Sequence, residues 1–409
     1  MSKGKLPIVV VFNGSYRRYD NIAWYKASGD VIPIVNIEKQ ENKRMQDFEI
    51  ECIRDLDKQF NGNLHVYWEA NLDIIFPGHQ IYYNILPNCS APTKNAKGFN
   101  FDYSFLDYTN FQRPYKVFSN FCSTWKNKVI PSSFGKSLKK RIVTSQVIFK
   151  DQKYTSYVPV QSNDIRGGRH FAKAILNKIS MNLEPFKKYG QTRNVLTIPT
   201  TRLSAYLNFG CISIREAAEV MAKNEELMTE LWWREFYNQI CFFFKEMYTS
   251  QAFYVKRDYW SQSKQVSNTS YLSQWKKGTT GVPIVDASIR CLNQTGYLHN
   301  RGRMIVASFL VKDLGIDWRI GETYFASQLI DYYFPSNNGG WQYISGTGAS
   351  SMMQSRKFDP WLQGSKYDPN ANFIKQYIPE LRHIPAKDIH MWYTKHDQYE
   401  NVYIPPIEI

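Results

Sequence analysis

No stretch of eighteen consecutive apolar residues occurs in the 409 residues of this sequence, so a membrane-spanning helix is not expected. The apolar start at 7–12 is soon followed by charged residues, which is unlike a signal peptide. The six cysteines include no CxxC pair, and the seven histidines include no HExxH motif. This spacing argues against a disulfide framework and against a metal site. We therefore expect reduced thiols in an intracellular protein, in the cytoplasm or in the nucleus of a eukaryote.

Negative charge is scarce relative to positive charge. Asp and Glu total 36 against 51 Lys and Arg, which gives a formal net charge of +15 at pH 7. A surplus of this size favours a polyanionic partner, either nucleic acid or a membrane surface, and has no bearing on the fold. Aromatic residues are plentiful at 16% of the chain, whereas disordered chains are poor in them. The composition therefore predicts a folded protein with an anionic partner.

The first seventy residues alternate between strand-like and helical patterns. Apolar runs at 7–12, 31–37 and 64–68 are typical of buried strands, and the apolar positions of 46–60 have helical spacing. This order predicts a parallel α/β layer. Gly14 follows the first run without a GxGxxG motif, so a Rossmann-type dinucleotide site is not supported.

The rest of the chain divides into an irregular part and a helical part. Residues 76–165 are rich in Asn, Pro, Ser and Lys and predict an irregular connection with one helix near 115–125. The basic cluster at 136–141 is more often a solvated face than a nucleic-acid contact. From Gly167 onward, apolar spacing of 3.6 residues predicts helices at 214–222, 225–247, 283–295, 301–314 and 321–332. The second half is thus predicted to be one large all-α domain.

Hydroxyl side chains gather at Thr200, Thr201 and Ser204, just before or inside the start of a predicted helix. Hydroxyls and free backbone N–H groups at a helix start form a natural phosphate site, favoured by the helix dipole. The simpler alternative is an ordinary N-cap.

A second candidate group shares one face of the helix predicted at 225–247. Glu230, Trp233, Arg234 and Tyr237 follow the i, i+3, i+4, i+7 spacing of such a face. A carboxylate, an indole and a guanidinium together could line a cavity that stacks on a planar ligand. On these residues alone, an indole in the core with charges at its rim is the simpler interpretation.

The segment HNRGRM places Asn300, Arg303 and Met304 on one helical face. An inward-pointing Arg303 needs a buried carboxylate, because an unpaired buried guanidinium is too costly, and Asp331 is the candidate partner. Residues 337–341 are predicted to form an irregular polar turn. These groups include no nucleophile, activating base or metal site, so a bound cofactor would have to supply the chemistry.

Longer motifs resemble the DNA photolyase and cryptochrome flavoproteins. The resemblance is carried by TTRLSAYLNFGCISIRE (200–216), WREFY (233–237), GTTGVPIVDASIR (278–290), LHNRGRMIVASFLVKDLGIDWR (298–319), NNGGWQYISGTG (337–348) and KYDPNANFIKQYIPEL (366–381). Shorter matches in the amino half are RRYDNIAW (17–24), YKVFSNF (115–121) and GGRHFAKAIL (167–176). The resemblance, closest to the class I enzymes for cyclobutane pyrimidine dimers, covers roughly the whole chain.

The resemblance implies an α/β photolyase-type domain at 1–120, an interdomain connection at 121–165 and a helical FAD-binding domain at 166–409. Contacts to the phosphates and ribityl chain of FAD would come from Tyr189, Thr200, Thr201, Leu203 and Ser204. The remaining flavin and adenine would be surrounded by Arg234, Asn300, Arg303, Asp331 and Asn337. Arg303 and Asp331 would be an ion pair beside the isoalloxazine, and Asn337 would face its N5.

The resemblance further implies light-driven repair of cyclobutane pyrimidine dimers in DNA. Enzymes for (6-4) photoproducts carry histidine in the segment where this sequence has Asn300 and Met304. A flipped-out dimer would be bound by Glu230, Trp233, Met304 and Tyr343, and the DNA phosphates by Arg193, Arg301 and Arg356. Excited, reduced FAD would pass an electron to the dimer and recover it after the ring splits. We expect the protein to act as a monomer.

Four departures from the family pattern stand out. Tyr333 occupies a position where a second Asp near the flavin is common, and Tyr343 replaces a Trp of the dimer pocket. Trp341 and Trp318 match the inner positions of the tryptophan electron-transfer chain, but Gln265 occupies the outermost one. The region 71–100 is unlike the antenna-binding loops of relatives, so a second, antenna chromophore is left open and without an identity.

Two alternatives belong to other classes of function. One is a cryptochrome-type blue-light photoreceptor without repair activity, against which Asn337, Glu230 and Met304 argue. The other is a basic nucleic-acid-binding protein that kept the fold and lost the flavin. The hydroxyl-rich segment at 200–204 and the pairing of Arg303 with Asp331 argue against it.

Overall fold

The computed structural model divides the chain into two compact units. One, here called the sheet unit, comprises Met1–Gln112, Lys126–Leu183 and Arg202–Glu235. The other, here called the helical unit, comprises Arg113–Trp125, Glu184–Thr201 and Phe236–Ile409. The structure describes residues 6–86, 91–99, 102–127, 140–143, 148–159, 165–258, 260, 269–350 and 357–408.

The sheet unit is built on a parallel sheet. Its strands are β1 (Ile8–Val11), β2 (Gly29–Ile37), β3 (His65–Trp68), β4 (Gln80–Asn84), β5 (Lys97–Phe99) and β6 (Lys140–Ile142). The order is β3-β2-β1-β4-β5, with β6 also paired to β2, and every pairing is parallel. In the register, Val9 lies opposite Ile32 on β2 and Ile81 on β4. The predicted α/β layer is therefore confirmed.

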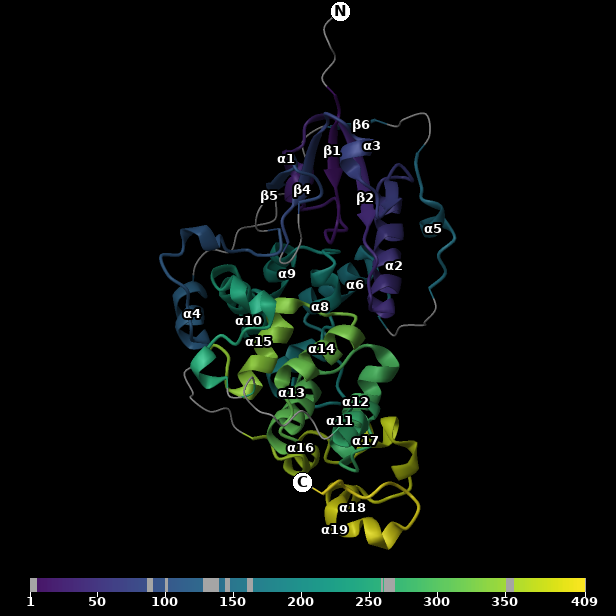
Figure 1. The fold of residues 1–409 in the computed structure, drawn as a ribbon, viewed down its shortest axis with the longest axis vertical. Coiled ribbons are helices and arrows are strands. Elements are labelled where there is room, and N and C mark those ends of the chain that lie inside the picture. The colour runs from purple at the N-terminus through teal and green to yellow at the C-terminus, as the bar shows by residue number, and fades with distance from the viewer. Residues whose placement is uncertain are drawn as a thin grey trace, which may run out of the picture. The chain divides into compact units, whose positions relative to one another are not determined.

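Helices accompany this sheet because its strands are apolar on both faces. They are α1 (Ile22–Lys26), α2 (Lys43–Gln59), α3 (Leu72–Ile75), α5 (Gln152–Thr155), α6 (Arg169–Ser180), α8 (Ser204–Asn208), α9 (Ile214–Met221) and the first part of α10 (Glu225–Phe243). Figure 1 shows α2 running alongside β2. The start of α2 is set by Asn42, whose side chain accepts hydrogen bonds from the N–H groups of Arg44 and Met45.

The prediction of an irregular connection over 76–165 is wrong in part. Three short strands, β4, β5 and β6, and the small helix α5 lie in this stretch. Strands of three to five residues are too short to show a clear alternation, and partner strands elsewhere in the sheet supply their hydrogen bonds. The basic cluster at 136–141 lies mostly outside the described residues.

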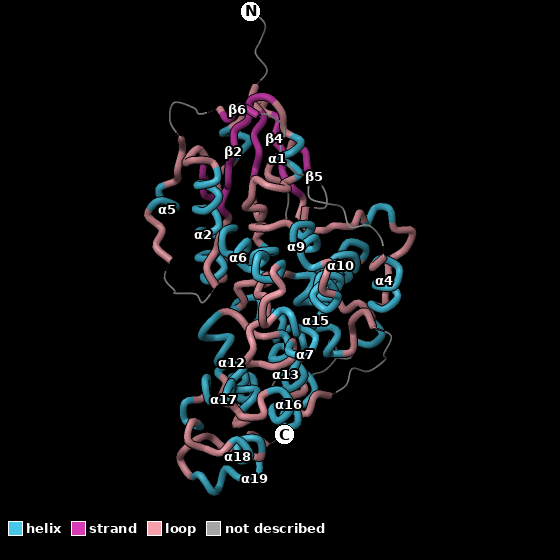
Figure 2. Tube along the Cα trace, turned by 180° about the vertical axis from the view of Figure 1, so that it is seen from behind, coloured by secondary structure: helices cyan, strands magenta, loops and turns pink. Residues whose placement is uncertain are grey.

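The helical unit contains α4 (Phe118–Trp125), α7 (Tyr189–Thr192), the end of α10, α11 (Thr269–Lys277), α12 (Pro283–Thr295), α13 (Asn300–Ser308), α14 (Trp318–Gln328) and α15 (Phe334–Ser345), followed by α16 (Pro360–Tyr367), α17 (Asn372–Tyr377), α18 (Ala386–His390) and α19 (Trp392–Lys395). Figure 2 shows these as short helices joined by loops. Helix α12 begins with Pro283 in its first turn and ends at Gly296, whose φ of 67° is the left-handed conformation of a helix stop. Trp275, Trp318 and Trp392 are fully buried in the core of the unit.

The prediction of an irregular turn at 337–341 is also wrong, because these residues lie inside α15. Two adjacent glycines weaken a helical pattern by about 1 kcal/mol each, so the sequence alone does not favour a helix there. Tertiary packing supplies the compensation. A Cβ on Gly339 would lie 2.2 Å from Cδ1 of Tyr237, so only glycine lets α10 and α15 approach this closely.

The two glycines of α15 give a matched test of this packing. We expect Gly339→Ala to lower the free energy of unfolding by about 1–3 kcal/mol through overpacking against Tyr237. Gly340→Ala meets no atom within 4 Å and should raise stability by up to about 1 kcal/mol, because alanine favours a helix. Urea denaturation of both variants measures the difference. Equal effects of the two substitutions would contradict the packing of Tyr237 on Gly339.

Candidate functional site

Arg303 and Asp331 form the ion pair that the sequence predicts. Arg303, on α13, donates from Nη2 to both carboxylate oxygens of Asp331 at 2.9 Å. Its Nε donates to the carbonyl of Leu298 at 2.7 Å. Asp331 is 5% exposed, and it lies in the short connection between α14 and α15. The pair thus places one positive and one negative group in a partly buried wall of the helical unit.

Side chains of α13 point in two directions, Asn300 and Met304 in one and Arg301 in the other. His299 is the N-cap, and its Nδ1 accepts a hydrogen bond from the N–H of Arg301 at 3.1 Å. The amide of Asn300 lies 3.7 Å from the sulfur of Met304, which puts both on one face as predicted. Arg301 points elsewhere and bonds Oδ1 of Asn194 at 2.8 Å.

Arg301 is held by a small cluster of its own. Its guanidinium lies 4.5 Å from the ring centroid of Tyr367, which is a cation–π contact. Burial lowers the pKa of this guanidinium, but an arginine stays charged in proteins. The side chain is therefore a fixed positive charge, suited to a phosphate group.

Asn337 is oriented by a buried acid. Its Nδ2 donates to Oε1 of Glu322 at 3.0 Å, and Tyr332 donates to the same oxygen at 3.0 Å. Burial raises the pKa of Glu322 above its usual range. Because Glu322 holds the NH2 end of the amide, the carbonyl end of Asn337 is directed away from it.

Helix α10 carries the group Glu230, Trp233 and Arg234, all half-buried. The neighbouring Trp232 is the core residue: it is 4% exposed and packs edge-on against Phe105 with ring centroids 5.0 Å apart. Trp233 is less buried than Trp232, and its assignment to a ligand stays a prediction.

The same helix is anchored on its other side by Glu235. This fully buried carboxyl accepts hydrogen bonds from the hydroxyls of Ser104 and Tyr108 and from the N–H of Phe105. Burial raises its pKa to about 7. These hydrogen bonds fix the rotation of α10 about its axis and so determine the direction in which Glu230, Trp233 and Arg234 point.

The hydroxyl-rich segment does not form an ordinary N-cap. The N-cap of α8 is Leu203, whose side chain makes no capping hydrogen bond, and Ser204 is the first helical residue. Thr200 pairs through Oγ1 with the hydroxyl of Tyr297 at 3.1 Å. The alternative of a hydroxyl N-cap is thus wrong, and the phosphate interpretation stays a prediction.

A family model described as the FAD binding domain of DNA photolyase matches residues 227–407. Deoxyribodipyrimidine photo-lyase of Escherichia coli is 37% identical over 288 residues, which are 68% of this chain and 60% of that protein. The photo-lyase of Buchnera aphidicola subsp. Baizongia pistaciae is 45% identical over 216 residues, or 50% of this chain and 45% of that protein. The chain thus spans about half the length of these curated relatives.

Among solved structures, an archaeal photolyase from Sulfolobus tokodaii, described with two FAD molecules, superposes with a TM-score of 0.85 and 28% identity. The match covers 99% of this chain and 96% of that one. The chain belongs to the photolyase/cryptochrome family. A class III photolyase from Agrobacterium tumefaciens, at 23% identity and a TM-score of 0.85, shares the fold.

The two tryptophans that are predicted to transfer electrons lie in the core of the helical unit. Trp341 is 3% exposed and packs edge-on against Phe325 with ring centroids 5.0 Å apart. Trp318 is fully buried, with the guanidinium of Arg319 4.7 Å from its ring centroid. Gln265 lies outside the described residues, and the electron path stays a prediction.

The remaining predicted site residues are divided between the two units. In the helical unit, Tyr189 and Tyr343 are half-buried and Arg193 is exposed. Leu203, Ser204, Glu230, Trp233 and Arg234 belong to the sheet unit. Arg356 lies outside the described residues. The roles assigned to all of these through the photolyase resemblance stay predictions.

Two polar residues near Asn337 were not predicted from the sequence. Glu322 orients Asn337, and Asn238 on α10 accepts the hydroxyl of Tyr333 at 2.6 Å. Both are buried polar groups on mostly apolar helices, which is the only signal that could have marked them. Their partners lie 15 and 95 residues away, so sequence spacing does not reveal the pairing.

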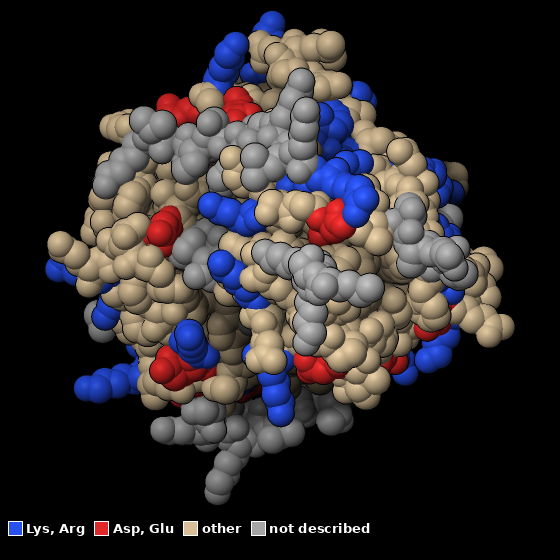
Figure 3. Space-filling view, turned by 90° about the horizontal axis from the view of Figure 1, so that it is seen from above, with Lys and Arg blue, Asp and Glu red and all other residues tan. Residues whose placement is uncertain are grey.

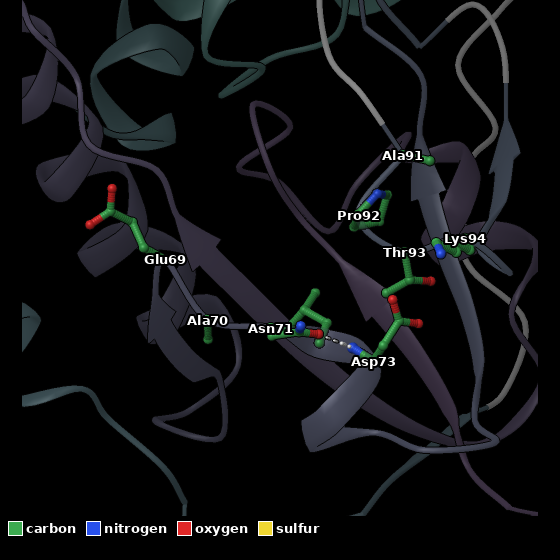
Figure 4. A pocket seen from close by; sticks show the side chains of 9 residues that line it. Glu69, Ala70, Asn71, Asp73, Ala91, Pro92, Thr93 and Lys94 are labelled. Atoms are coloured by element: carbon green, nitrogen blue, oxygen red, sulfur yellow. Dashed lines mark hydrogen bonds between the residues drawn. The ribbon is translucent and has the colours of Figure 1, made fainter.

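A separate cavity of about 450 Å³ lies in the sheet unit. It is lined by residues that follow β3 and β4, namely Glu69, Ala70, Asn71, Leu72, Asp73, Ala91, Pro92, Thr93 and Lys94 (Figure 4). Open parallel sheets bind ligands at the carboxyl ends of their strands. None of the predicted photolyase site residues lines this cavity.

Among the described residues, no helix is long and apolar enough to cross a membrane. The same residues contain no group of three or more His, Cys, Asp or Glu side chains that could hold a metal ion.

Proposed function

We propose that this protein repairs cyclobutane pyrimidine dimers in DNA in a light-driven reaction with bound FAD. The observation that carries the proposal is the ion pair of the half-buried Arg303 with the buried Asp331. Like Asn337, both residues lie in the segment matched by the FAD-binding family model. The relatives' shared name, deoxyribodipyrimidine photo-lyase, supports the same reaction. The catalytic domain in this proposal is the helical FAD-binding domain at 166–409.

The residues present fit FAD. A flavin has a polar edge of alternating donors and acceptors, and the wall around Arg303, Asp331 and Asn337 offers both kinds of group. One buried amide nitrogen in this wall, Nδ2 of Asn238, has no hydrogen-bond partner among the described residues, as expected of a donor that serves a ligand. Contacts to the phosphates and ribityl chain of FAD are assigned to Tyr189, Thr200, Thr201, Leu203 and Ser204.

Reduced FAD, when bound, supplies the light-absorbing electron donor for ring splitting. The chain's own residues position the reactants. Arg303 and Asp331 orient the flavin ring, and Asn337 presents its carbonyl end because Glu322 holds the NH2 end. Arg234 and Asn300 are assigned to the same cofactor through the resemblance.

The lesion is assigned to a second set of residues. Glu230 accepts hydrogen bonds from the dimer bases, Trp233 and Tyr343 stack on them, and Met304 packs alongside. The dimer is flipped out of the duplex to reach this set, and a damaged, poorly stacked pair costs less to extrude. That difference supplies part of the selectivity for damaged DNA.

Affinity for DNA is assigned to the positive surface. The net charge is +15, and Lys and Arg side chains are spread over the face drawn in Figure 3, with Asp and Glu between them. Arg301 is one fixed charge of this kind, and Arg193 and Arg356 are assigned the same role. Because phosphate contacts release counterions, binding should weaken steeply as salt rises.

The test is a repair assay with purified protein and a thymine-dimer oligonucleotide under reducing conditions, in blue light and in the dark. Restored thymines in the light only are the expected result. Light-independent binding without repair would contradict the proposed enzyme activity. The photoreceptor alternative would then remain, although the relatives' names do not favour it. A protein that cannot be loaded with FAD would exclude both and leave the flavin-free alternative.

Trp233→Ala is expected to weaken binding of dimer-containing DNA by about 5–150-fold, since one base–aromatic stack is worth about 1–3 kcal/mol. FAD content, read from the absorbance spectrum, should not change. Trp361→Ala is the matched control: this half-buried indole packs on Tyr393 in the carboxy-terminal helices and should leave DNA binding unaltered. Loss of flavin in Trp233→Ala would show that the lesion pocket is wrongly assigned.

Three further assignments complete the proposal. The cavity beyond β3 and β4 is the expected place for an antenna chromophore of unknown identity. The protein acts as a monomer. It works inside the cell, in the cytoplasm or in a eukaryotic nucleus, in keeping with free thiols at Cys52, Cys122, Cys211, Cys241 and Cys291.

A further inference from the structure

Asn238 is a buried amide with one end satisfied. It lies near the end of α10 and is 2% exposed. Its Oδ1 accepts a hydrogen bond from the hydroxyl of Tyr333 at 2.6 Å. Its Nδ2 is also buried and has no hydrogen-bond partner among the described residues. Since buried polar groups in native proteins are almost always paired, this nitrogen calls for an explanation.

A second tyrosine–asparagine pair in the same unit shows what a satisfied amide looks like. Tyr324 donates to Oδ1 of Asn293 at 2.6 Å, the same distance as in the first pair. There, however, Nδ2 donates to the backbone carbonyl of Lys276 at 2.8 Å. The two pairs share their chemistry, but Asn293 is half-buried and has a protein acceptor for its NH2 group, whereas Asn238 is buried and has none among the described residues.

The place of Asn238 suggests which acceptor is missing. Its partner Tyr333 stands between Asp331 and Asn337, directly before the first residue of α15. The preceding residue on α10, Tyr237, packs closely against Gly339 of α15, where a Cβ would lie 2.2 Å from its ring. Asn238 therefore faces the start of α15, in the wall assigned above to the flavin.

We propose that Asn238 is a cofactor-contacting residue whose Nδ2 donates a hydrogen bond to a carbonyl oxygen on the polar edge of the flavin ring. Tyr333 is its positioning residue, because its hydroxyl holds Oδ1 and so directs Nδ2 toward the ligand. The inference rests on the proposed function, since it requires that FAD occupies the helical unit. Both members of the pair are neutral, so the contact adds no charge beside the flavin.

The first test is FAD binding by apo-protein, followed by fluorescence, in the variant Asn238→Leu. Loss of one buried hydrogen bond should weaken FAD binding by about tenfold. The infrared carbonyl bands of the bound flavin should move to higher frequency, because a hydrogen bond to C=O lowers them. Asn293→Leu, the matched control, breaks a similar pair whose amide has its own protein acceptor and should change neither readout.

Two further variants keep the proposal testable if Asn238→Leu does not fold. Asn238→Asp places a carboxylate beside the flavin and should shift its midpoint potential to more negative values, since added negative charge disfavours reduction. Tyr333→Phe leaves the amide without its positioning partner and should weaken FAD binding by about threefold.

The outcomes separate this inference from the proposed function. Wild-type protein that binds FAD, together with Asn238 variants whose affinity, carbonyl bands and potential match those of the wild type, would overturn the inference alone. Wild-type protein that fails to bind FAD would overturn the proposed function and the inference with it. Loss of thermal stability that is equal in Asn238→Leu and Asn293→Leu, with flavin readouts unchanged, would show that Asn238 has only a structural role.

Discussion

Replacing Asp331 by leucine is expected to lower the free energy of unfolding by about 2–3 kcal/mol and to release FAD from the protein. The substitution leaves the guanidinium of Arg303 without its carboxylate, and breaking a buried pair by removing one partner costs about 3–5 kcal/mol. The effect should fall below that range because the Arg303 side chain is 24% exposed. Urea denaturation and the flavin absorbance of the purified variant are the measurements.

Two controls make the result specific. The double variant Arg303→Met with Asp331→Leu removes both charges and should recover much of the lost stability, because no unpaired charge remains. It should not recover FAD. Glu380→Ala breaks a second pair in the same unit, with Arg290, but the Glu380 side chain is 42% exposed, so the loss should be about 1 kcal/mol or less. A double variant no more stable than Asp331→Leu would contradict the role of the pair.

The second large effect is a loss of stability as pH rises toward neutrality. Two buried carboxyls, Glu49 and Glu235, have their pKa raised from 4.5 to about 7 by burial. Each binds its proton more tightly in the folded chain than in the unfolded chain. Stability from this source is therefore complete below pH 4.5 and is lost as pH rises to about 7, by about 3 kcal/mol for each carboxyl.

Denaturation in urea at several pH values between 5 and 8 measures this slope. Glu235→Gln cannot ionise, so its free energy of unfolding should fall less with pH than that of the wild type, by up to about 3 kcal/mol over the window. Glu49→Gln should behave in the same way, because the Glu49 carboxyl is also buried and accepts a hydrogen bond from Tyr16. Glu226→Gln, on the exposed face of α10, should keep the wild-type slope. A wild-type stability independent of pH between 5 and 7 would contradict the burial of both acids.

Sequence patterns were reliable where the signal is local. The apolar runs of β1, β2 and β3 and the helical spacing of α2 and α12 predicted these elements closely, since a buried strand or helix face needs a continuous pattern of its own. The pairing of Arg303 with Asp331 was also foreseen, because a buried guanidinium requires a carboxylate. The long motifs around these residues also indicate the family.

The elements that the sequence pattern did not predict share a different physical cause. The strands β4, β5 and β6 are three to five residues long, and their hydrogen bonds come from neighbours far away in the chain. In α15, glycines that weaken a helix locally are required by the ring of Tyr237 from another helix. In each case, tertiary contacts override a weak local preference.

The sequence by itself therefore determined the fold class, the family, the pairing of Arg303 with Asp331 and most of the candidate site residues. Only the tertiary structure decided that Glu322 orients Asn337, that Glu235 anchors α10 and that the buried amide nitrogen of Asn238 has no partner in the part of the chain that the structure describes. The reason is that burial and hydrogen-bond partners are properties of three-dimensional neighbours. A local sequence pattern does not show which buried polar group is available to bind a ligand.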